Sequence, residues 1–148
     1  MRITQEADYA LRICAVLAQT SSPVGAPALS ADLNLPPRFT SKILRKLSLA
    51  GIVVSTRGVS GGFSLAVDPE LLTLKKVIES IDGTVEIRHC LNNDHDCAYQ
   101  HNKNECRFHN VFEKLNTIIT TRLDMLTIAD MTDPAIPIAE LTNRLNKF

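Results

Sequence analysis

Residues 35–66 read LPPRFTSKILRKLSLAGIVVSTRGVSGGFSLA, and this stretch decides the fold class. Its first half predicts a helix over 37–50 that stops at Gly51, because glycine commonly follows a helix C-terminus. Helical spacing divides this helix into two faces. Its apolar face holds Phe39, Ile43, Leu44 and Leu47, and its basic face holds Arg38, Ser41, Lys42 and Arg45. A shorter predicted helix over 26–33 and a turn at 34–36 precede it, an order typical of a helix-turn-helix whose second helix enters the major groove of DNA.

The second half of the stretch predicts a two-stranded hairpin. Residues 52–56 are rich in β-branched side chains, and residues 63–67 are the predicted partner strand. The tip between them is RGVSGG. Such a hairpin after a helix-turn-helix makes a winged helix, so we predict a mainly α fold with a small β-hairpin wing. An arginine at the tip can reach a narrow minor groove, and glycines let the backbone approach phosphates closely.

These elements predict individual DNA contacts. We expect contacts near base edges from Arg38, Ser41 and Lys42, and phosphate contacts from Arg45 and Lys46. At the wing tip we expect contacts from Arg57, Gly58 and Ser60. The alternatives are a basic helix face that is merely solvated and an ordinary flexible hairpin loop.

Charge is unevenly distributed along a chain whose net charge is zero. Residues 1–66 carry seven Lys/Arg and three Asp/Glu, whereas residues 67–148 carry nine Lys/Arg and thirteen Asp/Glu. No acid lies between Leu33 and Val67. This pattern is typical of a polyanion-binding face within a neutral protein.

The flanking segments predict three further helices and a tail. Thr4 caps a first helix over 4–20, on whose apolar face Cys14 is expected as a small core residue. Thr73 caps another helix that ends at Gly83. A long helix runs from near Cys106 to about 128, and its apolar stripe is broader than one small domain can cover. We therefore expect it to pair with the same helix of a second chain, giving a homodimer. A tail follows over 132–148, with a short helix over 138–146.

Residues 88–109 concentrate three of the four cysteines and all four histidines. The segment has too few apolar residues to fold by hydrophobic burial. Thiolates and imidazoles suit iron–sulfur clusters, zinc and copper, so we expect a metal centre here. No apolar run approaches the roughly 18 residues of a spanning helix, and acids occupy the place of a signal peptide's apolar region. We expect a cytoplasmic protein without membrane association, in which cysteines are free thiols or metal ligands.

The chain resembles the Rrf-two family of bacterial winged-helix transcriptional regulators, with its IscR-like, NsrR-like and RirA-like members. The resemblance covers about residues 1–130. It is carried by the opening MRITQEADYALR, the stretch at 35–66 with its wing pattern RGxxGGFxLA, LKKVIESIDG, three cysteines, and a long helix ending LTIADM. The family resemblance implies a homodimer that binds operator DNA.

The resemblance also implies a [2Fe–2S] or [4Fe–4S] cluster on Cys90, Cys97 and Cys106. In IscR-like members a histidine completes the ligand set, with two residues between it and the last cysteine, and His109 matches. In NsrR-like members the fourth ligand is an aspartate of the partner subunit's first helix, and Asp8 matches. We favour Asp8, because a ligand in the first helix would tie the cluster to the DNA-binding unit; His89, His95 and His101 are further candidates. The cysteine gaps of six and eight residues are wider than the family's usual five.

We therefore divide the chain into a winged helix-turn-helix DNA-binding domain (1–83), a cysteine-rich cluster-binding loop (84–109), a dimerisation helix (106–131) and a tail (132–148). The predicted function is a DNA-binding regulator, a repressor rather than an enzyme, whose cluster senses iron–sulfur status, nitric oxide or redox stress. One alternative keeps DNA binding but places a zinc or thiol switch at the cysteines. A remote alternative is an electron-transfer iron–sulfur protein.

Overall fold

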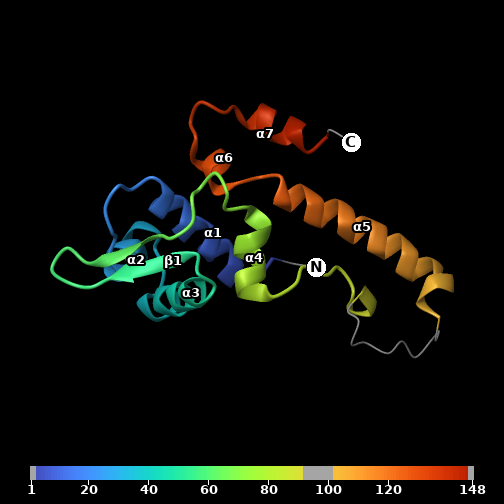
Figure 1. The fold of residues 1–148 in the computed structure, drawn as a ribbon, viewed down its shortest axis with the longest axis horizontal. Helices are drawn as coiled ribbons and strands as arrows, with labels where there is room; N and C mark the ends of the chain where they lie inside the picture. Colours follow the sequence, from blue (N-terminus) through green and yellow to red (C-terminus); the bar gives the residue numbers. More distant parts are fainter. Residues whose placement is uncertain (1–2, 92–101, 147–148) are drawn as a thin grey trace.

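The structure is a computed structural model that describes residues 3–91 and 102–146 (Figure 1). Its elements, in chain order, are α1 (Gln5–Ala18), α2 (Ala26–Asp32), α3 (Pro37–Leu49), β1 (Val53–Thr56), β2 (Gly62–Leu65), α4 (Leu74–Asp82), the 3-10 turns η1 (His89–Leu91) and η2 (Lys103–Glu105), α5 (Arg107–Asp124), α6 (Ile128–Thr132) and α7 (Ile138–Arg144). The predicted mainly helical fold with a two-stranded wing is confirmed. No helix among the described residues is long and apolar enough to cross a membrane.

Helix α1 is the centre of the winged-helix unit. As predicted, Thr4 is its N-cap, and the Thr4 hydroxyl accepts a hydrogen bond from the Ala7 N–H at 3.2 Å. One face of α1 is fully buried against α3, α4, α6 and β2. Cys14 lies on this face with no exposed surface, which confirms it as a core residue.

The wing is an antiparallel hairpin joined by a third short segment. Val53 pairs with Leu65 at one end of the hairpin, and Thr56 pairs with Gly62 at the other. Val24, from the loop before α2, exchanges two backbone hydrogen bonds of 2.9 Å with Phe63. The Val24 segment therefore holds β2 at Phe63, close to the tip end of the strands, while the 57–61 tip extends away from the body (Figure 1).

Helix α5 extends away from the winged helix and ends earlier than predicted (Figure 1). The expected helix reached about 128, but the structure ends it at Asp124 and begins α6 at Ile128. Backbone pairing explains the break, because Leu74 N–H donates to Leu126 O at 2.9 Å and Ile128 N–H donates to Leu72 O at 2.8 Å. These long-range bonds draw the chain out of the α5 axis and back to the body.

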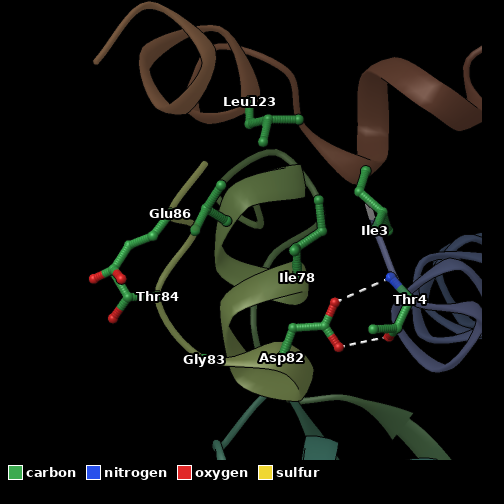
Figure 2. A pocket seen from close by; sticks show the side chains of 9 residues that line it. Ile3, Thr4, Ile78, Asp82, Gly83, Thr84, Glu86 and Leu123 are labelled. Carbon is green, nitrogen blue, oxygen red and sulfur yellow. Dashed lines mark hydrogen bonds between the residues drawn. The ribbon is translucent and has the colours of Figure 1, made fainter. Parts of the chain in front are cut away.

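A joint connects α1, α4 and α5. Figure 2 shows the Asp82 carboxylate, at the end of α4, accepting hydrogen bonds from the Thr4 backbone N–H at 3.2 Å and the Thr4 hydroxyl at 2.5 Å. A pocket of about 260 Å³ lies beside this pair, with Ile3 and Leu123 among its lining residues. Because Leu123 belongs to α5, this joint links the winged helix to the long helix.

Candidate nucleic-acid interface and cysteine region

Helix α3 has the two faces that its sequence predicts. Its inner face is fully buried and consists of Thr40, Ile43, Leu44 and Leu47. Its outer face is exposed and consists of Arg38, Ser41, Lys42 and Arg45. The helix begins at Pro37, as the fixed φ of proline favours, and it lies directly after α2 in helix-turn-helix order. The geometry is suited to a recognition helix.

Two lysines of α3 bind an acid of α1 that sequence reasoning did not place in the interface. The Lys42 Nζ lies 3.1 Å from Glu6 Oε1, and the Lys46 Nζ lies 3.1 Å from Glu6 Oε2. Burial alone would raise the pKa of Glu6, but hydrogen bonds from the two lysines and their charges outweigh it and lower that pKa. Glu6 lies 36 residues before Lys42. The only feature of the local sequence that marked Glu6 was its position in the first turn of a predicted helix.

The wing tip presents the predicted residues but gives one glycine another role. Arg57, Gly58 and Ser60 are exposed, and Gly58 has a φ of +118°, which strongly favours glycine. At Gly62, a Cβ would lie 2.6 Å from the carbonyl carbon of Val24. Gly62 is therefore required by the packing of the wing on its own protein, whatever the DNA does.

The described part of the cysteine segment is attached to α5. The Ile87 N–H donates a hydrogen bond to Asn116 Oδ1 at 3.0 Å. The guanidinium of Arg88 lies over two aromatic rings of the same helix, 5.7 Å from the centre of Phe108 and 5.3 Å from that of Phe112. These contacts hold Cys90, in η1, beside the N-terminal half of α5.

Cys106 occupies the N-cap position of α5. The Asn110 side chain donates to the Cys106 carbonyl at 2.9 Å and to the Asn104 carbonyl at 3.0 Å, which orders this helix end. His109 lies one turn along, and its Nδ1 is buried with no hydrogen-bond partner among the described residues. A buried imidazole nitrogen without a partner is open to a further ligand.

Of the remaining candidate cluster ligands, only some lie within the described residues. Cys97, His95 and His101 lie outside the described residues. Within residues 3–91 and 102–146, no three His, Cys, Asp or Glu side chains form a group that could hold a metal ion. Asp8 is partly exposed and pairs with Arg12 of the next turn, with 3.0 Å between its Oδ2 and the Arg12 Nε.

Cys14 is chemically separate from the other described thiols. Burial raises the pKa of the Cys14 thiol to about 12, so it stays protonated at neutral pH. Cys90 and Cys106 are only partly buried, and both are free thiols. The structure thus divides the described cysteines into one core residue and two candidate ligands.

Comparison with known proteins decides the family. The family model Rrf2, described as an iron-dependent transcriptional regulator, matches residues 3–134. The chain belongs to the Rrf2 family. An rrf2-like HTH-type transcriptional regulator of Rhodobacter capsulatus is 33% identical, with 94% of this chain and 97% of that protein covered. The regulator IscR of Vibrio cholerae is 27% identical, with 88% of this chain and 75% of that protein covered.

Solved structures agree with the Rrf2 fold. CymR, the global cysteine regulator of B. subtilis, is 23% identical with a TM-score of 0.71, and the match covers 89% of this chain and 96% of that one. The predicted Rrf-two resemblance and winged-helix fold are therefore confirmed. This Rrf2 protein is a transcriptional regulator with a DNA-binding winged helix.

Proposed function

We propose that this Rrf2 regulator is a homodimeric repressor that binds a double-stranded operator and holds an iron–sulfur cluster, [2Fe–2S] or [4Fe–4S], on Cys90, Cys97 and Cys106. The observation that carries the cluster proposal is at the start of α5. There Cys106 occupies the N-cap position, and His109 one turn along keeps a buried Nδ1 without a partner among the described residues. Coordination of an iron ion of the cluster would satisfy that nitrogen.

The fourth ligand in this proposal is His109. Residues 106 and 109 lie on the same side of one helical turn, so a thiolate and an imidazole can reach one iron together. Asp8 of the partner subunit is the competing ligand, but in this chain its carboxylate already pairs with Arg12. That pair is exposed and worth at most about 1 kcal/mol, so it opposes Asp8 only weakly. The unpartnered His109 nitrogen is the stronger indication.

A bound cluster supplies a redox-sensitive, ligand-sensitive charge at the start of α5. The residues between the cysteines and the winged helix are suited to transmit its state. Ile87 bonds to Asn116 of α5, and the Val85 N–H donates to Glu79 of α4 at 3.4 Å. Helix α4 then meets α1 through Asp82 and Thr4 (Figure 2). We infer that cluster loss changes the spacing of the two recognition helices in the dimer through this joint.

The proposed contact with the operator is based on the exposed face of α3 and on the exposed wing. Arg38 and Arg45 on α3, together with Arg57 on the wing, form no ion pair with any other described residue. An arginine guanidinium can donate paired hydrogen bonds to a guanine edge or to a phosphate, and it also binds in narrow minor grooves. A repressor action follows if the bound dimer occludes a promoter. A transcription assay on DNA selected by this protein, with and without the chain, tests that step.

The deciding experiment is anaerobic purification of the full chain, followed by a visible spectrum and counts of iron, zinc and acid-labile sulfide per chain. We expect iron with matching sulfide and charge-transfer absorbance. His109→Ala should shift that spectrum and shorten the lifetime of the cluster in air. The same changes in His89→Ala, with none in His109→Ala, would contradict His109 as the fourth ligand.

Two results would contradict the proposal in different ways. Zinc, or metal-free protein with reactive thiols, would replace the cluster by a zinc or thiol switch and leave DNA binding intact. A spectrum that responds to Asp8→Ala but not to His109→Ala would keep the cluster and move the fourth ligand to the partner's first helix.

A further inference from the structure

The four cations of helix α3 fall into two classes. Arg38 and Arg45 are exposed and form no ion pair with any other residue in the described part of the chain. Lys42 and Lys46 both bind the carboxylate of Glu6, whose side chain is only 15% exposed. An acid from α1 therefore neutralises part of a face whose own sequence contains no acid.

Lys46 is turned toward the protein rather than toward solvent. Its Nζ binds Glu6 Oε2 at 3.1 Å and donates a hydrogen bond to the carbonyl of Ile81, at the end of α4, also at 3.1 Å. These bonds place the ammonium between α1, α3 and α4. A lysine held in this way is poorly placed for the phosphate contact that its sequence position suggests.

Lys42 is held less tightly. Its side chain is 57% exposed, its Nζ lies 3.1 Å from Glu6 Oε1, and the ammonium is 5.9 Å from the centre of the Phe39 ring. Together the two lysines and Glu6 carry one net positive charge instead of two. Because non-specific DNA affinity depends on the number of phosphates neutralised, Glu6 lowers that affinity without touching the exposed arginines.

We propose that Glu6 is a positioning residue that sets DNA specificity, by restraining Lys42 and Lys46 so that Arg38, Ser41 and Arg45 dominate recognition. The inference rests on the proposed operator binding. Arginine reads guanine edges in a bidentate manner, while a mobile lysine binds any phosphate as a point charge. Restraining the lysines therefore removes sequence-independent affinity and leaves sequence-dependent affinity in place.

The test is the salt dependence of binding by the full chain and its Glu6→Gln variant. Glutamine keeps the size of the side chain but removes the charge. The probes are a 30-bp duplex of random sequence and a duplex that the wild type selects from a random library. The matched control is Glu113→Gln, which removes one exposed carboxylate on α5, far from α3 in sequence and on another element.

We expect Glu6→Gln to bind the random duplex more tightly, with a slope of log K against log salt steeper by about 0.9 for each lysine freed per subunit. Between 50 and 200 mM salt one such contact changes K roughly 3- to 4-fold more than in the wild type. The ratio of selected to random affinity should fall. Glu113→Gln should match the wild type in slope and ratio.

A second comparison begins in the wild-type background, where its result does not depend on the folding of a Glu6 variant. In the wild-type background, Lys46→Gln should leave the salt slope nearly unchanged, whereas Arg45→Gln should reduce it by about 0.9 per subunit. In the Glu6→Gln background, Lys46→Gln should also reduce the slope, because the lysine is then free to contact phosphate. This change between backgrounds is a signature that a merely structural ion pair would not produce.

The outcomes separate this inference from the proposed function. If the wild type binds neither duplex in a salt-dependent manner, operator binding fails and the role of Glu6 fails with it. If the wild type selects a sequence but Glu6→Gln behaves like Glu113→Gln, only the role of Glu6 is overturned. Equal loss of slope for Lys46→Gln and Arg45→Gln in the wild-type background would overturn it as well.

Discussion

At the scale of single residues, Gly62 shows how the absence of a side chain positions the wing. A Cβ at this site would lie 2.6 Å from the carbonyl carbon and 2.7 Å from the carbonyl oxygen of Val24. We predict that Gly62→Ala lowers the free energy of unfolding by about 1–3 kcal/mol, because two backbone segments must separate. Urea unfolding followed by circular dichroism measures this change, and affinity for DNA should fall with it.

Gly25→Ala is the matched control for Gly62. Its Cβ would meet only the Pro27 Cδ at 3.7 Å, an ordinary contact, and Gly25 has a φ of −67° that alanine adopts readily. We expect Gly25→Ala to change the free energy of unfolding by less than about 1 kcal/mol. Equal destabilisation by the two substitutions would show that Gly62 is not needed for the approach of the Val24 segment.

At the scale of elements, a capping box begins the short helix α6. The Thr127 hydroxyl accepts from the Asp130 N–H at 3.1 Å, and the Thr127 N–H donates to Asp130 Oδ2 at 2.9 Å. Arg144 of α7 donates to Asp130 Oδ1 at 2.6 Å. Burial alone would raise the pKa of Asp130, but the bonds from Thr127 and Arg144 outweigh it and lower that pKa. Asp130 therefore ties α6 to α7 through its charge.

This lowered pKa makes the contribution of Asp130 to the free energy of unfolding depend on pH. The carboxylate stabilises the fold above the ordinary aspartate pKa near 3.9, and this stabilisation is lost as the pH falls through the lower folded value. We predict that Asp130→Asn costs roughly 0.3–1 kcal/mol at pH 7 and that the cost shrinks below about pH 4. Denaturant unfolding at both pH values measures the cost. The control is Asp32→Asn, which removes an exposed carboxylate at the end of α2 that forms no ion pair with any described residue, and it should lower the free energy of unfolding at pH 7 by less than Asp130→Asn.

At the scale of the whole molecule, α5 leaves an apolar stripe uncovered. Phe108, Val111, Leu115 and Ile118 recur at heptad-like spacing and are 69%, 58%, 44% and 38% exposed. No residue of α5 is fully buried. An exposed stripe of this kind is typical of an interface between subunits, so a second copy of the helix is the expected partner.

We predict that the wild type is a dimer and that Leu115→Glu makes it monomeric, because the substitution places a charge within this stripe. Sedimentation velocity at micromolar concentration measures the change. Thr117→Glu adds the same charge at an exposed position of α5 outside the four-residue stripe and should stay dimeric. A monomeric wild type, or a dimer that survives Leu115→Glu, would contradict the role of α5.

Local signals in the sequence determined the elements of this protein. Thr4 and Thr73 cap α1 and α4 as predicted, and both cap hydrogen bonds are present. Helix α3 spans Pro37–Leu49, within one residue of the prediction, because proline, glycine and helical periodicity act over a few neighbouring residues. The same motifs identified the family, and Cys14 was correctly placed in the core. The DNA contacts, the ligand set and the dimer stay predictions.

Contacts between distant parts of the chain fix how those elements meet. Glu6 binds Lys42 across 36 residues, and Val24 pairs with Phe63. The strand-like pairing of Thr73 with Thr127 ends α5 before the predicted 128. None of these contacts leaves a periodic signal, because each joins segments whose separation in the chain is arbitrary. Local sequence patterns therefore suffice to predict the winged helix and its basic face. The fold decided which cations on that face bind the protein and which remain exposed for DNA.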